Sequence, residues 1–487
     1  MKTLFVFDDH AIPFRSNVDL TLLQGVKYAG NPVLRRGKPG EPDARWARLW
    51  GGTVLRDKGK FRMWYSGAGS VQEWMLMTFK MLYAESDDGI HWVKPDLSLA
   101  EYSGSKSNNI VNIEYPVEMP AVMIDEGEDI PAQERYKMFS ENLKGEKSLP
   151  FVAVSPDGLH WDVVAHPKHR GVALYKFNGY YHSSFVLYTP ELPGGYPGGR
   201  VMGTIRSRDY KNWTGEPCVA FHRANYFMNP PDISEQVHTP AGFWNRDNVI
   251  LGVYGQIHQI EAKTGTKFAR AGSGMEDTTE DLGLILSNDG IHFREAIPGF
   301  KFVGRGEKGE WDGGSLVPAN SFVNTGDFTY LYYGAWQNGM CFDNSAGDVG
   351  LAYWRRDSFG YVRIRNADES AVIQTEAIEA TGRERKIYVN FDMDSFREGC
   401  GLKFELVDPS GRVLPGYSEE ESVMCSNPGL FRQVRWKEHQ GIDKDVLVSV
   451  ELRVIFVTNG DRTPYLDTCS SPLLYCIYIA DENENLE

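Results

Sequence analysis

The stretch SDDGIHW, residues 86–92, returns almost unchanged as SPDGLHW at 155–161 and as SNDGIHF at 287–293. Two weaker copies are SRDYKNW at 207–213 and RRDSFGY at 355–361. Each copy follows short aromatic segments separated by Gly, Asp or Asn, which is typical of antiparallel hairpins. The chain therefore builds one β-rich unit five times, and repeats of this length suit the blades of a propeller better than a short solenoid unit.

The chemistry of the repeated turn indicates a structural role. Ser and Asp side chains bond nearby backbone N–H groups, and Gly adopts a backbone conformation that other residues resist. The motif resembles the Asp-box of sialidases, S-x-D-x-G-x-x-W, with one residue fewer between Asp and Gly. We predict that Asp88, Asp157 and Asp289 bond backbone N–H groups of their own hairpins, far from a central channel.

The fold class that these repeats predict is all-β. A five-bladed β-propeller is expected over residues 30–365, after an N-terminal extension over 1–29. After YWRRDSFGYVRI the repeat stops, and longer strands such as RKIYVNFDM and VLVSVELRVIFV follow. This second pattern predicts a C-terminal β-sandwich over 370–480.

Composition limits the partners and the location. The formal net charge of −15, with no basic cluster, argues against nucleic acid and membrane surfaces as partners. The start MKTLFVFDDHAIPF lacks the apolar core of a signal peptide, which predicts a cytoplasmic location. The six cysteines form no C-x-x-C pair, which favours reduced thiols, and one disulfide in the last quarter of the chain stays open.

The propeller followed by a sandwich resembles the family 32 glycoside hydrolases, which cleave fructans, and the propeller alone resembles families 43, 68 and 130. The segments GNPVLRRG, GGTVLRDKGKFRMWYSG, GEWDGG and GDVGLAYWRRDSFGY are similar to those of bacterial family 32-like glycosidases. This resemblance implies a carbohydrate substrate and a glycosidase acting on a furanoside or related glycoside. The family's W-M-N-D-P-N-G, R-D-P and E-C motifs do not occur, so no catalytic role is transferred to a position in this chain.

Acids at the start of the innermost strands are the candidate catalytic residues, because glycoside hydrolysis usually uses two carboxyl groups. The stretch NPPDISEQVHTPAGFW opens blade four with Asp232, Glu235 and His238. Side chains alternate along a strand, so Glu235 and His238 face opposite sides. The alternative is a polar loop with a satisfied histidine.

Blades two and five supply the other two candidate acids. Glu118 lies in IEYPVEMPAVMID, which opens blade two. Asp312 lies in GEWDGGSLVPA, which opens blade five, and Trp311 beside it is a candidate for substrate contact. The alternative for Asp312 is a structural turn with the following glycines. We predict a carboxylate pair drawn from Asp312, Glu235, Asp232 and Glu118.

Candidates for substrate binding come from blades one, three and four. The stretch PDARWARLWGG contributes Asp43, Arg45 and Arg48, and YKFNGYYHSSF contributes Tyr181 and His182. A guanidinium group binds sugar hydroxyls or carboxylates through a fork of hydrogen bonds. The alternatives are arginine stacked on a neighbouring tryptophan, and core packing for the blade-three pair. The blade-four candidate, His238, either tunes a neighbouring carboxylate or binds a sugar hydroxyl.

No Walker loop, H-E-x-x-H, nucleophile elbow or dinucleotide fingerprint appears, so we expect no cofactor and no metal site. Two further functions stay open, a glycan-binding propeller without catalysis and a glycoside phosphorylase. The sugar, its linkage, the stereochemical course and the oligomeric state are also open.

Overall fold

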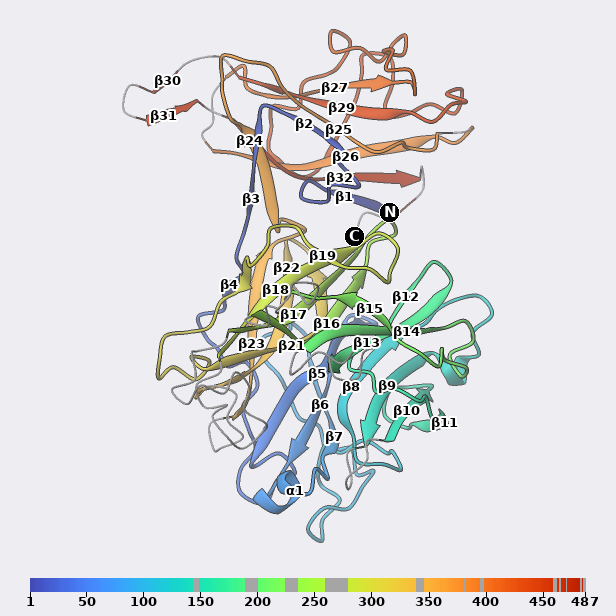
Figure 1. Ribbon diagram of the computed structural model, residues 1–487, viewed down its shortest axis with the longest axis vertical. Coiled ribbons are helices and arrows are strands. Elements are labelled where there is room, and N and C mark those ends of the chain that lie inside the picture. The colour runs from blue at the N-terminus through green and yellow to red at the C-terminus, as the bar shows by residue number, and fades with distance from the viewer. Residues whose placement is uncertain are drawn as a thin grey trace, which may run out of the picture.

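The structure is a computed structural model, shown in Figure 1. It describes residues 1–142, 149–188, 200–223, 235–258, 279–338, 346–380, 382–394, 398–458, 462–463, 466–469, 471–481 and 484. Within these residues the only helical segments are α1 (Val71–Met75) and a 3-10 turn at Ala132–Glu134. The chain is almost all β, as the sequence predicts.

Five successive antiparallel strand groups lie between residues 46 and 355, and strands that follow one another in a group are hydrogen-bonded neighbours. The exception is the fourth group, in which β19 and β20 both pair with β18. We call the first strand of each group its leading strand. The groups are, in order, β5 (Trp46–Asp57), β6 (Lys60–Ala68) and β7 (Lys80–Ser86); β8 (Glu118–Ile124), β9 (Tyr136–Asn142), β10 (Leu149–Ser155) and β11 (Asp162–Ala165); β12 (Tyr175–Phe177), β13 (Tyr180–Tyr188), β14 (Arg200–Ser207) and β15 (Cys218–Phe221); β16 (Glu235–Asn245), β17 (Ile250–His258), β18 (Thr279–Ser287), β19 (Arg294–Glu295) and β20 (Lys301–Val303); and β21 (Ser315–Thr325), β22 (Phe328–Trp336) and β23 (Ala346–Arg355).

The leading strands, together with the residues just before them, are called the leading segments, and those of all five groups meet around Asn320 of β21. Its Nδ2 donates to the carbonyls of Gly51 at 2.9 Å and of Val172 at 3.2 Å, and its Oδ1 accepts from the N–H of Gly242 at 3.1 Å. Met119 of β8 packs against Gly51, where a Cβ would lie only 2.7 Å from the Met119 Cβ. The five leading segments therefore converge on one place.

The repeated turns make the predicted hydrogen bonds. Asp88 Oδ1 accepts from two backbone N–H groups of its own turn, both at 2.8 Å. Asp157 and Asp289 accept the matching pairs at 2.8 or 2.9 Å. The indole N–H of Trp92 closes the first turn by donating to the carbonyl of Gly89 at 3.1 Å. These turns are built by their own residues, so the predicted hydrogen bonds are confirmed, while the purely structural role stays a prediction.

Each of the first four turns also bonds a neighbouring strand group. The turns of groups two, three and four contact the preceding group, and the turn of group one contacts group five. The bonds are Trp64 Nε1 to Gly158 O at 2.7 Å, Tyr210 OH to Met138 O at 2.6 Å, Tyr175 OH to Gly290 O at 2.9 Å, and Tyr332 OH to Gly89 O at 2.7 Å.

The fifth copy departs from the pattern at Asp357. This carboxylate is fully buried and forms an ion pair with Arg246, which follows β16, at 3.1 Å. It also accepts the hydroxyl of Tyr478 at 2.8 Å. The fifth turn therefore contacts the preceding group as the others do, and it joins the groups to the C-terminal part of the chain.

Two further antiparallel sheets contain both ends of the chain. One has the order β28-β26-β32-β24-β3 with β1 on β32, and the other has the order β2-β25-β29-β27, while β4 pairs with β23 and β30 with β31. The bounds are β1 (Lys2–Phe5), β2 (Phe14–Ser16), β3 (Val18–Leu22), β4 (Val26–Lys27), β24 (Gly360–Ile364), β25 (Ala371–Gln374), β26 (Arg385–Met393), β27 (Gly401–Val407), β28 (Gly429–Gln433), β29 (Glu451–Val457), β30 (Arg462–Thr463), β31 (Leu466–Cys469) and β32 (Pro472–Asp481).

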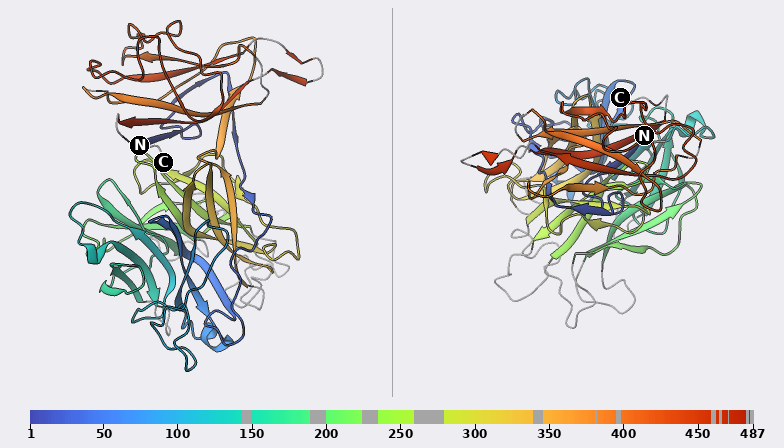
Figure 2. Two further views of the ribbon diagram at one scale, coloured as in Figure 1. Left: turned by 180° about the vertical axis from the view of Figure 1, so that it is seen from behind. Right: turned by 90° about the horizontal axis from the view of Figure 1, so that it is seen from above.

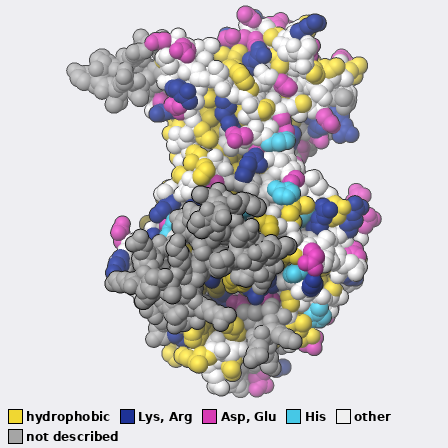
Figure 3. Space-filling model, viewed as in Figure 1, with side chains coloured by type: hydrophobic (Ala, Val, Ile, Leu, Met, Phe, Trp, Pro, Cys, Tyr) yellow, Lys and Arg dark blue, Asp and Glu magenta, His cyan; other side chains and the backbone are white. Residues whose placement is uncertain are grey.

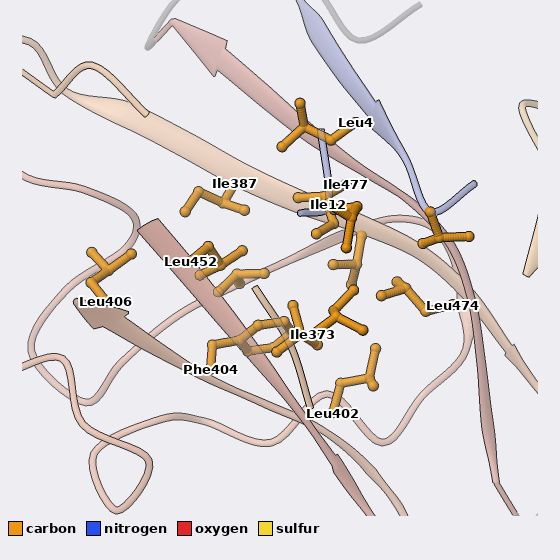
Figure 4. Close-up of a cluster of buried hydrophobic side chains, with 14 of the residues drawn as sticks. Leu4, Ile12, Ile373, Ile387, Leu402, Phe404, Leu406, Leu452, Leu474 and Ile477 are labelled. Atoms are coloured by element: carbon orange, nitrogen blue, oxygen red, sulfur yellow. The ribbon is translucent and has the colours of Figure 1, made fainter. Parts of the chain in front are cut away.

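Apolar side chains of these two sheets form one buried cluster. Figure 4 shows Leu4 and Ile12 from the start of the chain among Ile373, Leu402 and Ile477 from the C-terminal strands. The N-terminal strands β1 to β3 therefore belong to this part of the molecule by pairing and by packing. The boundaries 1–29, 30–365 and 370–480 stay a prediction.

The left view of Figure 2 shows the C-terminal sheets stacked on one side of the five strand groups. On the face drawn in Figure 3, acidic and basic side chains are interspersed over the C-terminal part. Cys218, Cys400, Cys425 and Cys476 carry free thiols. Among the residues described above, no helix is long and apolar enough to cross a membrane.

Candidate functional site

Strand β5 places three large side chains on one face. Successive side chains of a strand point to opposite sides, so Trp46, Arg48 and Trp50 share one face while Leu49 faces a separate apolar cluster. The Arg48 guanidinium lies over the Trp50 ring at 4.0 Å and over the Trp46 ring at 4.9 Å, measured to the ring centroids. The stacking of arginine on tryptophan is therefore present, and it is buried.

Glu118, at the start of β8, forms an ion pair with Arg48. The two side chains are 4% exposed for Arg48 and 7% for Glu118. Glu141, which lies opposite Glu118 in β9, adds a second carboxylate whose charge acts on Arg48. Burial lowers the pKa of Arg48, and the charge of Glu118 opposes that change. The sequence candidates Arg48 and Glu118 thus come together across two strand groups.

His238 in β16 forms a second buried pair, with Glu280 at the start of β18. Its Nδ1 lies 3.0 Å from both carboxylate oxygens of Glu280. Gly255 in the intervening strand β17 makes room for this carboxylate, because a Cβ there would lie 1.6 Å from Glu280 Oε1. The missing side chain lets a residue of the third strand reach the leading strand.

Burial opposes charge on both members of this pair. Burial raises the pKa of Glu280 well above its usual value, the charge of Arg200 opposes this, and Asp281 adds to it. Burial also lowers the pKa of His238 well below its usual value, and the charges of Arg200 and Arg48 act in the same direction. Burial therefore favours the uncharged form of both side chains.

Trp50 connects the two pairs. Its ring centroid lies 5.0 Å from the His238 ring and 5.5 Å from the ring of Trp336, the last residue of β22. Arg48 stacks on the same indole. Side chains from groups one, two, four and five therefore meet in one cluster, which we call the Trp50 site and define as Arg48, Trp50, Glu118, His238, Glu280 and Trp336.

Three of the leading strands have a β-bulge directly after a residue that each contributes to this cluster. The pairing register shifts directly after Arg48 in β5, after Glu118 in β8 and after His238 in β16. Bulges are over-represented next to active sites, where they redirect side chains. The same irregularity therefore occurs where Arg48 pairs with Glu118 and where His238 contacts the Trp50 ring.

Several buried polar atoms of the Trp50 site have no hydrogen-bond partner among the residues described. They are the donors Arg48 Nε, Trp50 Nε1 and Trp336 Nε1, and the acceptor Glu118 Oε2. Buried polar groups are nearly always bonded, and an unbonded one costs about 1–3 kcal/mol. Three donors and one acceptor in one cluster are therefore left for water or a polar ligand to bond.

Asp312 has contacts that favour the structural alternative. Its Oδ2 accepts from Lys27 Nζ at 2.6 Å and from the hydroxyl of Tyr333 at 3.1 Å. In the first group, Asp43 Oδ2 has the matching partners, the Nζ of Lys94 at 2.6 Å and the hydroxyl of Tyr65 at 2.8 Å.

The loops that carry these two aspartates repeat each other as well. Gly37 N–H donates to the Asp43 carbonyl at 3.2 Å, and Gly306 N–H donates to the Asp312 carbonyl at 3.1 Å. In both groups the aspartate fixes the loop before the leading strand, so we leave Asp43 and Asp312 out of the proposed site.

The neighbours of these aspartates lie beside the loops. Trp311 stacks on Tyr333 with ring centroids 5.9 Å apart, so its ring packs against the partner of Asp312. The backbone N–H of Arg45 donates to the carbonyl of Ala68 at 3.0 Å, and its side chain is half-buried. Within the described part of the chain, neither residue forms a hydrogen bond or a ring contact with the Trp50 site.

Tyr181 and His182 lie away from the Trp50 site. The Tyr181 hydroxyl bonds Asp125, which follows the last residue of β8, whereas Glu118 is the first residue of that strand. His182 is buried and stacks on Tyr175 with ring centroids 5.0 Å apart. Tyr181 therefore sits at the far end of β8 from Glu118, and His182 packs on a ring of its own strand group, which favours the packing alternative for both.

Asp232 and the side chain of Glu235 lie outside the described residues. Sequence reasoning missed Glu280, because it searched the leading strands and Glu280 belongs to a third strand. The signal is the dipeptide Glu280-Asp281 in front of an apolar strand, together with the glycine at 255 in the strand before it. Across the described residues, no group of three or more His, Cys, Asp or Glu side chains is placed to hold a metal ion.

No family model matches the chain. Two uncharacterized proteins of Mycobacterium tuberculosis, from strains CDC 1551 and H37Rv, are each 29% identical to it over 162 residues. The match covers 28% of this chain and 49% of each relative, so the chain spans about half the length of the curated relatives it matches.

Solved structures resemble the chain more weakly. A glycosyl hydrolase from Bacteroides ovatus is 16% identical, with a TM-score of 0.44 and coverage of 69% of this chain and 94% of that one. A β-1,2-mannobiose phosphorylase from Listeria innocua is 14% identical, with a TM-score of 0.43 and coverage of 69% and 96%. An α-L-arabinofuranosidase from Lactobacillus brevis is 9% identical, with a TM-score of 0.40 and coverage of 67% and 94%.

Proposed function

We propose that the chain is a carbohydrate-active enzyme that cleaves a glycosidic bond at the Trp50 site. In this proposal the five strand groups are the blades of a propeller over residues 30–365, and the two further sheets form a sandwich over 370–480. The convergence of the leading segments on Asn320 supports the propeller. The turn contacts support it too, because they run from each group to the one before it and from the first to the fifth.

The observation that carries the enzymatic proposal is the pairing of two carboxyl groups with unbonded donors in one cluster. Glu118 and Glu280 come from different strand groups and both lie within the Trp50 site. A sugar hydroxyl both donates and accepts hydrogen bonds, so it suits the acceptor Glu118 Oε2 and the donors of Arg48, Trp50 and Trp336.

The electrostatics support different roles for the two carboxyl groups in this proposal. Glu118 faces a guanidinium group and serves as the ionised carboxylate, which attacks the sugar or activates a water. Glu280 and His238 share a proton, and this pair supplies the acid for the leaving oxygen. Asp232 and Glu235 remain alternative acids. The substrate is a furanoside or related glycoside, on the resemblance to family 32.

A glycoside phosphorylase is the second candidate, and the arginines near the site favour it. Arg170 Nε lies 3.8 Å from Glu141 Oε2, and the charge of Arg200 acts on both His238 and Glu280. Guanidinium groups suit phosphate because their forked donors match its oxygens. In this case phosphate replaces water as the group that receives the sugar.

Both candidates can be tested with one substrate panel, assayed with and without phosphate in about 10-fold excess over the substrate. The panel contains 4-nitrophenyl furanosides and pyranosides together with inulin, levan and mannan. We expect release of 4-nitrophenol or free sugar from at least one substrate. Release that does not depend on phosphate identifies a hydrolase. A sugar 1-phosphate that forms only with phosphate identifies a phosphorylase. If no substrate turns over while sugars still raise the melting temperature, the chain binds glycans without cleaving them and the enzymatic proposal is wrong.

A further inference from the structure

The outer face of the sheet β2-β25-β29-β27 carries two side-by-side rows of side chains. Residues directly opposite one another on four neighbouring strands form each row. One row, called the polar row after its last three residues, is Phe14, Gln374, Arg453 and Glu405. The other, called the apolar row after its two central residues, is Ser16, Val372, Ile455 and Lys403. With strands about 4.8 Å apart, each row crosses about 14 Å of surface. Alternate residues of the same strands, such as Ile373 and Val454, point the other way into the core.

Hydrogen bonds hold the polar row in one conformation. The Arg453 guanidinium donates to Gln374 Oε1 at 3.2 Å and to Glu405 Oε2 at 2.9 Å. The amide of Gln374 donates to Glu451 in turn. Three planar side chains are therefore fixed before any ligand arrives, which lowers the entropy that binding costs.

A depression lies over the two rows at the Phe14 end. Its lining includes Phe14, Val372, Gln374, Arg453, Ile455 and Glu419. Phe14 is 52% exposed although it belongs to β2, the edge strand of this sheet. Apolar surface with a few fixed polar groups in a concave place is the usual composition of a small-ligand site.

The chemistry of this face favours a neutral, hydroxyl-rich ligand. Arg453 is neutralised by Glu405, and Lys403 lies 3.8 Å from Glu419, so the face offers no excess positive charge to an anion. Strands β25 and β29 have hydrogen-bonded neighbours on both sides, so their backbones are not available for an added strand. Recognition there therefore depends on side chains. The exposed ring and aliphatic side chains suit the apolar faces of a sugar, and the planar polar groups beside them suit its hydroxyl groups.

We infer that this face is a second carbohydrate-binding site, which holds a neutral polysaccharide chain across β2, β25 and β29. It lies in the C-terminal part of the molecule, and no residue of the Trp50 site contributes to it. The inference therefore does not depend on cleavage of a glycosidic bond.

Native gel electrophoresis of the full chain tests it, with inulin, arabinan, mannan or xylan cast into the gel. We expect at least one polysaccharide to slow migration, and Phe14→Ser and Gln374→Ala each to remove at least 80% of that retardation. Leu447→Ser is the matched control, because Leu447 is 72% exposed and lies outside both rows. All three variants should melt within a few degrees of the parent chain and turn over a small 4-nitrophenyl glycoside as the parent does.

Either of two results would overturn the inference. One is the absence of retardation by all four polysaccharides. The other is equal retardation of Phe14→Ser, Gln374→Ala and Leu447→Ser, which places any polysaccharide site elsewhere. A chain that is retarded but cleaves no glycoside would refute the proposed enzyme and leave this site standing.

Discussion

Arg48 and Glu118 form an ion pair across two strand groups, with side chains only 4% and 7% exposed. Removing one partner of a buried pair leaves a charge without compensation, which typically costs about 3–5 kcal/mol. We expect Glu118→Gln to lower the free energy of unfolding in urea by about 3 kcal/mol. The double change Arg48→Met with Glu118→Leu should recover most of that loss. A loss under about 0.5 kcal/mol in the single variant would show that the pair does not form.

The repeated turn gives a second prediction. Asp157 accepts two backbone N–H groups of its own turn, so Asp157→Ala should lower the free energy of unfolding by about 1 kcal/mol. Turnover per folded molecule should not change. Asp129→Ala is the control, since Asp129 is exposed in a loop. A large loss of turnover with normal melting would contradict a purely structural turn.

Asp43 and Asp312 should behave alike. Each binds one lysine and one tyrosine, so Asp43→Asn and Asp312→Asn should each lower the free energy of unfolding by about 2 kcal/mol. Asp19→Asn, which removes an exposed pair with Arg365, should cost under about 0.5 kcal/mol. If Asp312→Asn abolishes turnover and keeps its melting temperature, Asp312 is catalytic after all.

Burial of His182 makes the fold sensitive to acid. Burial, helped by the charge of Arg206, lowers its pKa from 6.5 to about 4. As the pH falls below 6.5 the unfolded chain gains a proton that the folded chain does not, so stability falls toward pH 4. This amounts to about 2 kcal/mol between pH 7 and pH 5. His182→Phe keeps the ring stack on Tyr175 and should lose less stability over that range in urea titrations, whereas parallel curves for the two chains would contradict the shift.

The parts of the structure that sequence reasoning found depend on local chemistry. The turn at Asp88 and its copies could be predicted because acceptor, glycine and aromatic ring lie within seven residues. Arg48 and Glu118 could be selected because both stand at the start of a strand. Their pairing depends on matching bulges in separate strands, which no local pattern reveals.

The parts that it missed depend on distant partners. The structural alternative for Asp312 could not be favoured from the sequence, because its lysine partner, Lys27, lies 285 positions away. Glu280 was overlooked because it reaches His238 only across Gly255, and that gap exists only once three strands are in register. Carboxylates before strands were therefore easy to find, and the choice between a structural and a catalytic role required tertiary contacts.

The most direct test of the Trp50 site is the turnover of Glu118→Gln and Glu280→Gln on the glycoside that the substrate panel identifies, measured per folded molecule. Glu295→Gln is the matched control, since Glu295 is a largely buried carboxylate that accepts the hydroxyl of Tyr254 at 2.6 Å in the same strand group as Glu280. We predict that both site variants lose at least about 100-fold in kcat, the loss typical of removing a catalytic acid or base, while the control changes by less than about twofold. Turnover in Glu118→Gln and Glu280→Gln equal to that of Glu295→Gln would contradict the assignment of this site as the place where the glycosidic bond is cleaved.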